Sequence, residues 1–149
     1  QKSRFSLSHA LSETVDLFIP VATSTHRTLQ VSCAEDLYYV GNEEQFRQLF
    51  CLLLDNAIKY SAPDSTIELT LSKRGKHLCF IICNECNGLE KGSQDILFER
   101  FYRSDSSRNS STGGSGIGLS IAHSIVENHK GSIHAENPDG KTLQIKVLL

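Results

Sequence analysis

The sequence predicts a single domain of the α/β class, and three observations carry that prediction. Apolar residues recur every three or four positions in three separate segments, as they do in amphipathic helices. Short runs rich in β-branched and aromatic residues lie between those segments and end at turn residues. The chain has 149 residues, enough for one hydrophobic core, and shows neither an internal repeat nor a domain boundary.

The first part of the chain should form two helices with two short strands between them. The segment SLSHALSETVDLFIPVA predicts the first helix, and TLQVSC and LYYVG predict strands on either side of the turn-like AED. Asn42, followed three residues later by Gln45, resembles a capping box that opens the longest helix, EEQFRQLFCLLLDNAIKYS. The apolar positions that set the helical period are Leu7, Leu11, Val15, Phe18 and Ala22 in the first helix and Phe46, Leu49, Phe50, Leu53, Ala57 and Tyr60 in the second.

The second part should form two hairpins with a long loop and a third helix between them. STIELTLSKRGKHLCFIICN predicts a hairpin that turns at Arg74 and Gly75. A polar stretch over about 85–114 follows, interrupted by DILFERFY, and predicts a long functional loop with one small helix. The last helix is expected over about 116–129, before a closing hairpin formed by GSIHAEN and KTLQIKVLL.

Charge and hydropathy exclude several function classes. The formal net charge of −2 gives no overall attraction to nucleic acid or to an anionic membrane, so neither is expected as a partner. The longest wholly apolar run, Leu49 to Leu54, is too short to span a bilayer, and the N-terminus lacks a signal-peptide pattern. We therefore expect a soluble chain. It contains no methionine, which suggests a piece of a longer protein.

The five cysteines indicate buried thiols in a reducing compartment, because their number is odd and several lie in apolar stretches. Cys83 and Cys86 form a C-x-x-C pair. A zinc site would need a second ligand pair at a suitable spacing, and the sequence offers none, so no metal is expected on the cysteines.

Three polar features point to one ligand, a phosphate group. Four glycines fall within 113–118, at the start of a helix, where bare backbone N–H groups and the helix dipole favour an anion. Asn56 and Lys59 share one edge of the longest helix, where an amide oxygen could bind a metal ion and a cation could neutralise phosphate. Arg100, Arg103 and Arg108 precede the glycines. Taken singly, each feature could equally be a flexible loop or a solvated surface.

Three ordered motifs give these features a common context. LLLDNAIKYS, ILFERFYRSD and GGSGIGLSIAHSIVENHKG resemble the N box, F box and G2 box of the ATP-binding domain of bacterial sensor histidine kinases. The resemblance covers essentially the whole chain, 1–149, as one catalytic domain. It implies the fold of the GHKL group, which includes type II topoisomerases and chaperone ATPases. That fold is a two-layer sandwich with a mixed, mainly antiparallel sheet and helices on one face.

The resemblance also implies roles for particular residues. Asn56 would hold Mg²⁺ and Lys59 would contact the phosphates of ATP, as the catalytic pair. The loop over about 99–115 would be a mobile ATP lid. The nucleotide-binding residues implied are Tyr60, Asn84, Gly88, Phe98, Arg100, Phe101, Arg103, Gly114, Gly116, Gly118 and Leu119.

The sequence departs from the family pattern where the G1 box, D-x-G-x-G, is expected. Here the chain reads Asn84-Glu85-Cys86-Asn87-Gly88. Asn84 keeps one acceptor for the amino group of adenine but replaces the other with a donor, and a mispaired buried polar group costs about 1–3 kcal/mol. Asn84 could instead pair with both the amino group and a ring nitrogen, as asparagine does on DNA. Cys86 stands where glycine would let the backbone approach the base.

A second departure lies at the start of the N box. Leu52 stands one helical turn before Asn56, where these kinases carry asparagine and the GHKL ATPases carry the glutamate that activates water. Leucine can do neither, so an ATPase or topoisomerase role is disfavoured. Phosphoryl transfer to a histidine depends mainly on positioning and charge stabilisation. His9, in SHALSE, lacks the acidic residue and proline of a phosphoacceptor box and is interpreted as an ordinary helix residue.

The sequence therefore predicts the cytoplasmic catalytic domain of a membrane-anchored receptor. It would bind Mg²⁺ and ATP and supply the γ-phosphoryl group to a histidine on the receptor's own dimerisation domain, which would pass it to a response regulator. The alternative is a degenerate module that binds nucleotide weakly or not at all and works through protein contacts. Asn84, Cys86 and Leu52 favour that alternative, whereas Asn56, Lys59 and the glycines favour the kinase.

Overall fold

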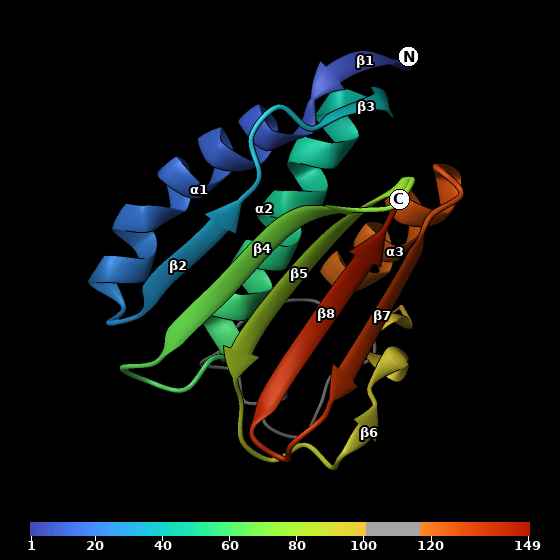
Figure 1. Ribbon diagram of the computed structural model, residues 1–149. Helices are drawn as coiled ribbons and strands as arrows, with labels where there is room; N and C mark the ends of the chain where they lie inside the picture. Colours follow the sequence, from blue (N-terminus) through green and yellow to red (C-terminus); the bar gives the residue numbers. More distant parts are fainter. Residues whose placement is uncertain (101–116) are drawn as a thin grey trace.

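The computed structural model describes residues 1–100 and 117–149 and has two layers (Figure 1). One layer is a six-stranded sheet in the order β2-β4-β5-β8-β7-β6. Its strands are β2 (Thr28–Cys33), β4 (Thr66–Arg74), β5 (His77–Glu85), β6 (Gly92–Ser93), β7 (Ser132–Asn137) and β8 (Thr142–Leu148). Among the described strands of this sheet, β2 and β4 pair in parallel and all other neighbours pair antiparallel. The mixed, mainly antiparallel sheet predicted for this chain is thus confirmed.

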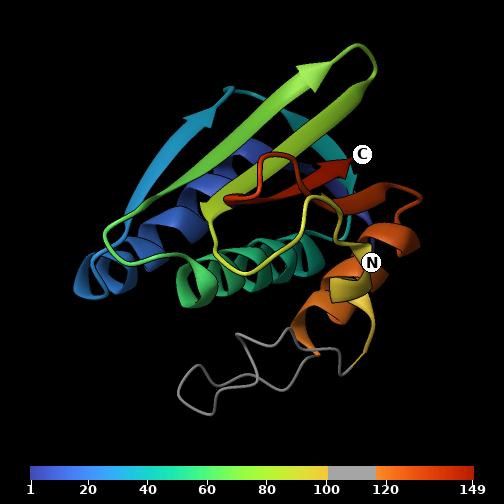
Figure 2. The same cartoon turned by 90° about the horizontal axis from the view of Figure 1, so that it is seen from below.

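The other layer consists of helices α1 (Leu7–Ser24), α2 (Glu43–Tyr60) and α3 (Gly118–Asn128), which lie together on one side of the sheet (Figure 2). Ser6 caps α1 by accepting a hydrogen bond from the His9 N–H, 3.1 Å away. Asn42 caps α2 in the same way, with the Gln45 N–H 3.1 Å from its Oδ1. Among the described residues no helix is both long and apolar enough to cross a membrane.

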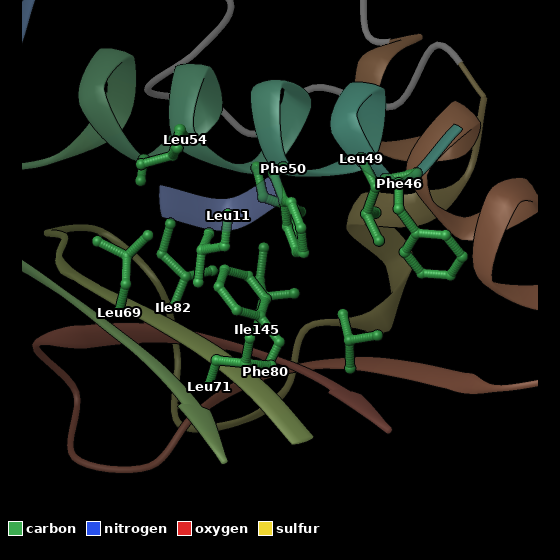
Figure 3. Close-up of a cluster of buried hydrophobic side chains, with 14 of the residues drawn as sticks. Leu11, Phe46, Leu49, Phe50, Leu54, Leu69, Leu71, Phe80, Ile82 and Ile145 are labelled. Carbon is green, nitrogen blue, oxygen red and sulfur yellow. The ribbon is translucent and has the colours of Figure 1, made fainter. Parts of the chain in front are cut away.

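The core lies between the two layers, where one face of α2 meets the sheet. Figure 3 shows side chains of α2 pointing toward those of β4, β5 and β8. The rings of Phe50 on α2 and Phe80 on β5 have centroids 5.1 Å apart. Each such side chain contributes about 1.5–3 kcal/mol when fully buried. The predicted apolar positions in α1 and α2 are buried or packed against this core except Tyr60, which is half-buried.

The structure corrects several details of the predicted elements. Two strands were not predicted, β1 (Ser3–Ser6) and the two-residue β6, because neither is long enough for an alternating pattern. The strands on either side of AED do not pair with each other: β2 joins the large sheet, and β3 (Tyr38–Gly41) pairs with β1 in a separate two-stranded ribbon. The small helix predicted at DILFERFY is a 3₁₀ turn, η1 (Asp95–Phe98).

Candidate functional site

The predicted site residues that the structure describes come from the last turns of α2, the end of β5, η1 and the start of α3. Asn84 shares a face of β5 with the buried Phe80 and Ile82, so its side chain is directed at the helix layer. The Ala62 N–H donates to the Glu85 carbonyl at 2.8 Å. This bond fastens the segment after α2 to the end of β5, so the fold holds Asn56 and Tyr60 at the same end of the sheet as Asn84.

Asn56 has an unusual environment, because its Oδ1 is buried and has no hydrogen-bond partner among the described residues. Leaving a buried acceptor unsatisfied costs about 1–3 kcal/mol. An amide oxygen is a hard ligand of the kind that Mg²⁺ binds, usually with water and substrate phosphates completing the shell. The described residues contain no cluster of three or more His, Cys, Asp or Glu side chains that could hold a metal by themselves. The amide oxygen of Asn56 is therefore suited to bind a magnesium ion whose other ligands include phosphate oxygens.

Lys59 lies one turn further along the exposed edge of α2. Its Nζ is 3.1 Å from Asp55 Oδ2, and the two side chains are 41% and 51% exposed. An exposed pair one helical turn apart contributes little to stability, about 0.3–0.5 kcal/mol. The ammonium group can therefore exchange Asp55 for a phosphate at low cost.

At the end of β5, the departures from the G1 box fit the fold without backbone strain. Cys86 is buried, packs in the core and has no positive φ, so this position does not require glycine for its conformation. Burial raises the pKa of its thiol. The φ of Gly88 is +87°, in the region that favours glycine. Asn84 is 4% exposed, and the hydrogen bond that the structure gives its side chain is a long one, 3.4 Å from Nδ2 to the Glu85 carbonyl.

The turn η1 is held against α3 and β7. Phe98 is buried, and its ring centroid lies 5.6 Å from that of His123 on α3. Asp95 accepts hydrogen bonds from the Ala135 N–H at 2.8 Å and from His134 Nδ1 at 2.9 Å. Burial alone would raise the pKa of Asp95, but these hydrogen bonds outweigh it and lower that pKa. Arg100 follows on an exposed stretch.

The start of α3 presents Gly118 and Leu119. No side chain caps this end of the helix among the described residues. The first N–H groups of a helix have no partner within the helix, and anions bind them readily. Leu52 of α2 lies opposite, with its Cδ2 3.6 Å from the place a Gly118 Cβ would occupy. The leucine that replaces a polar family residue thus packs between α2 and α3.

The remaining predicted site residues lie outside the described residues. These are Phe101, Arg103, Gly114, Gly116 and all but the first two positions of the predicted lid over about 99–115. Sequence reasoning also missed Asp95 and His123, which hold η1. Their partners are distant in the sequence, so no local signal could have indicated them.

The chain matches the family described as "Histidine kinase-, DNA gyrase B-, and HSP90-like ATPase" over residues 41–149. It is 36% identical over 148 residues to the probable sensor protein PcoS of Escherichia coli, covering 99% of this chain and 31% of that protein. The chain spans about a third of the length of the curated relatives it matches.

Solved structures of histidine kinases share the fold. A mycobacterial sensor histidine kinase, MprB, superposes with a TM-score of 0.84 at 20% identity, covering 100% of this chain and 97% of that one. The full-length histidine kinase ShkA, solved in complex with AMPPNP, gives a TM-score of 0.81 at 18% identity and covers 99% of this chain and 30% of that one.

Proposed function

Because the chain belongs to the histidine kinase-, DNA gyrase B- and HSP90-like ATPase family, as an ATPase domain of the sensor histidine kinase kind, we propose that it binds ATP with Mg²⁺ and donates the γ-phosphoryl group to a histidine. The observation that carries this proposal is the buried Oδ1 of Asn56, which has no hydrogen-bond partner within residues 1–100 and 117–149. A structural asparagine would have a partner for that atom, whereas a ligand-binding asparagine keeps it for the ligand.

The other residues of the site would act on the two ends of the nucleotide. Asn84, buried and facing the helix layer, would meet the adenine amino group with its Oδ1. Lys59 would leave Asp55 and neutralise phosphate charge, with Arg100 and Arg103 from the F-box region beside it. The N–H groups at Gly118 and Leu119 would hold phosphate oxygens, together with Gly114 and Gly116. AMPPNP, the molecule bound to ShkA, is an ATP analogue, which supports a nucleotide as the ligand.

The proposed reaction is phosphoryl transfer. The bond between the γ-phosphorus and the β,γ-bridging oxygen breaks, a bond forms from that phosphorus to an imidazole nitrogen, and ADP leaves. Mg²⁺ held by Asn56 would supply neutralising charge at the phosphates. Leu52 brings no carboxylate to the start of the N box, which disfavours activation of water and preserves the γ-phosphoryl for the histidine.

The acceptor histidine and the downstream partner lie beyond this chain. By analogy with the sensor proteins it resembles, the acceptor would be on the dimerisation domain of the same receptor, and a response regulator would receive the phosphoryl group. The domain would work on the cytoplasmic side of a membrane-anchored receptor.

The test is phosphorylation of the whole receptor with ATP labelled at the γ-phosphate. We expect an acid-labile, alkali-stable label, the signature of phosphohistidine, that requires Mg²⁺. Asn56→Ala should reduce the labelling rate at least about a hundredfold, because it removes a group used in the transition state. Gln48→Ala, an exposed position on the same helix, serves as the matched control and should label normally.

Absence of label from a folded receptor with an intact acceptor histidine would contradict the proposal. The degenerate protein-contact module predicts that outcome together with no nucleotide binding. The comparisons lend that alternative no support, since the relatives and neighbours are sensor kinases.

A further inference from the structure

His129 is the residue that follows the end of α3. It connects α3 to the N-terminal end of α2, whereas the candidate site lies at the C-terminal end of α2. Its side chain is buried, with 9% of the residue exposed. Its Nδ1 lies 2.8 Å from the carbonyl oxygen of Ile125, and its Nε2 lies 3.1 Å from the backbone nitrogen of Asn42. Asn42 is the N-cap of α2. The capping box predicted at Asn42 and Gln45 is therefore only half formed, because the Asn42 N–H donates to His129 and not to the Gln45 side chain.

These two bonds determine the protonation state of the ring. A carbonyl oxygen can only accept, so Nδ1 must carry a hydrogen. A backbone N–H can only donate, so Nε2 must be bare. The structure assigns His129 the neutral Nδ1–H tautomer, since a proton at Nε2 would face another donor in a buried place.

The fold gives this ring a fitted space. Its centroid is 4.6 Å from that of Phe46 on α2 and 6.1 Å from that of Tyr39 on β3, with Phe5 of β1 packed beyond them. Gly41 leaves room for it: a Cβ there would lie 3.0 Å from His129 Cδ2 and 2.7 Å from Tyr39 Cε2. Three elements, α2, β3 and α3, thus meet at one imidazole, with β1 behind them.

The contact between His129 and Asn42 bears on the candidate site because a helix is stiff, so holding one end of α3 also limits where its other end can lie. Helix α3 has eleven residues and begins at Gly118, so at 1.5 Å per residue Gly118 lies about 16 Å from His129 along the helix axis. Gly118 at the near end packs opposite Leu52, one turn from Asn56. The contact between His129 and the start of α2 would therefore help to set how Gly118, at the other end of α3, faces Asn56.

We propose that His129 is a positioning residue: its neutral ring joins the end of α3 to the N-cap of α2, and its protonation releases this joint and weakens nucleotide binding. The second half of this statement rests on the proposed function. The first half concerns the folded chain alone.

The other titratable and charged groups near the ring come from β3, α2, α3 and the residue that follows His129. Tyr39 on β3 donates its hydroxyl to the His129 carbonyl at 3.4 Å, and burial raises the pKa of that hydroxyl further above neutrality. On α2, Glu43 follows Asn42 but is paired with Arg47 at 2.9 Å. On α3, the nearest acid is Glu127, which is paired with His123 at 3.2 Å. Lys130 follows in the chain and is exposed.

The first arm of the test is histidine nitrogen NMR on the wild-type chain, with amide hydrogen exchange at Asn42. We expect a protonated Nδ1 and a bare Nε2 at neutral pH, and an Asn42 amide that loses protection as the ring gains a proton. An Nε2–H tautomer, or an Asn42 amide whose exchange only follows hydroxide concentration, would overturn the proposal.

The second arm compares affinity for AMPPNP with Mg²⁺ at about pH 7.5 and about pH 5.5, the range in which histidine changes charge. His129→Gln keeps an acceptor for the Asn42 N–H and cannot titrate, whereas His129→Asn keeps only the donor side. We expect the affinity of the wild type relative to His129→Gln to fall about threefold to tenfold on acidification. His9→Gln, an exposed position, should follow the wild type and corrects for protonation of the nucleotide itself.

The two arms separate the two claims. Parallel pH profiles for the wild type and His129→Gln would overturn the positioning role even if nucleotide binds well. If no variant binds nucleotide at either pH, the proposed function fails and the role in binding with it, while the NMR arm still decides whether His129 forms the joint.

Discussion

At the scale of single residues, Asn56 is the side chain whose environment the fold alone does not explain. Its Oδ1 is buried and has no hydrogen-bond partner in the described part of the chain, although one turn earlier in the same helix a leucine occupies the neighbouring position facing α3. If stability alone mattered, an apolar residue would be favoured at both positions 52 and 56. The polar atom is therefore the observation that best supports the proposed ligand.

Replacing Asn56 by alanine should separate stability from binding. Because the change removes an unsatisfied buried acceptor, the midpoint of thermal unfolding should stay the same or rise slightly without nucleotide. The stabilisation that Mg²⁺ and AMPPNP give the wild type should disappear in the variant. Thermal unfolding with and without ligand checks both, and Gln48→Ala provides the control. A variant that unfolds several degrees lower without ligand would show that Asn56 is structural.

Cys86 gives a second prediction at this scale. Glycine is the residue of the G1 box at this position, yet here the side chain is buried in the core and the backbone needs no positive φ. Cys86→Gly should therefore lower the free energy of unfolding by about 1–2 kcal/mol, through a lost contact and greater chain entropy. Denaturant unfolding measures this, and Cys86→Ala, which should cost less, isolates the glycine effect. An unchanged or raised stability in Cys86→Gly would contradict the assigned packing.

At the scale of elements, the junction of β3, α2 and α3 depends on close approach at Gly41. A Cβ at this position would overlap the rings of Tyr39 and His129. Gly41→Ala should cost about 1–3 kcal/mol of unfolding free energy. Gly118→Ala is the matched comparison, because a Cβ there meets Leu52 at an ordinary 3.6 Å and alanine suits a helix. It should be neutral or mildly stabilising, and equal losses in the two variants would refute this account.

The turn η1 depends on Asp95, which joins it to β7. Because the pKa of Asp95 is lowered in the folded chain, its contribution to stability is fully present above the unfolded pKa, about 3.9, and is lost as pH falls from there through the lower folded pKa. Asp95→Asn should therefore lower stability at pH 7, by about 0.5–1 kcal/mol for a partly exposed group. The difference from wild type should shrink with acidification and vanish once pH is below the folded pKa of Asp95. Urea unfolding at several pH values tests this, with the exposed Asp16→Asn as control; a pH-independent difference would contradict it.

The elements that could be predicted from the sequence were those long enough to show a repeating apolar pattern or a local cap or turn signal. Leu7, Leu11 and Val15 define α1, and the Asn42 cap defines the start of α2, because these signals are local. The two strands that were missed, β1 and β6, exist only through their partners Tyr38–Gly41 and Glu136–Asn137. Pairing with distant residues leaves no mark in a stretch of two to four residues.

At the scale of the whole molecule, the same distinction applies to the site. The ordered motifs around Asn56, Phe98 and Gly118 predicted the family and the two-layer fold. They could not predict that Leu52 fills the space beside Gly118, that Asp95 is bound by His134, or that His129 replaces half of a capping box. Each of these contacts joins residues at least 39 positions apart, so only tertiary structure brings them together.

The central claim is that this chain binds ATP together with Mg²⁺ through Asn56 and Asn84. The most direct measurement is isothermal titration of the chain with AMPPNP, with and without Mg²⁺. We predict binding in the micromolar to low millimolar range that requires Mg²⁺ and tightens in Asn84→Asp, which restores a second acceptor for the adenine site. No heat at several millimolar nucleotide, from a chain that circular dichroism shows to be folded, would contradict the account.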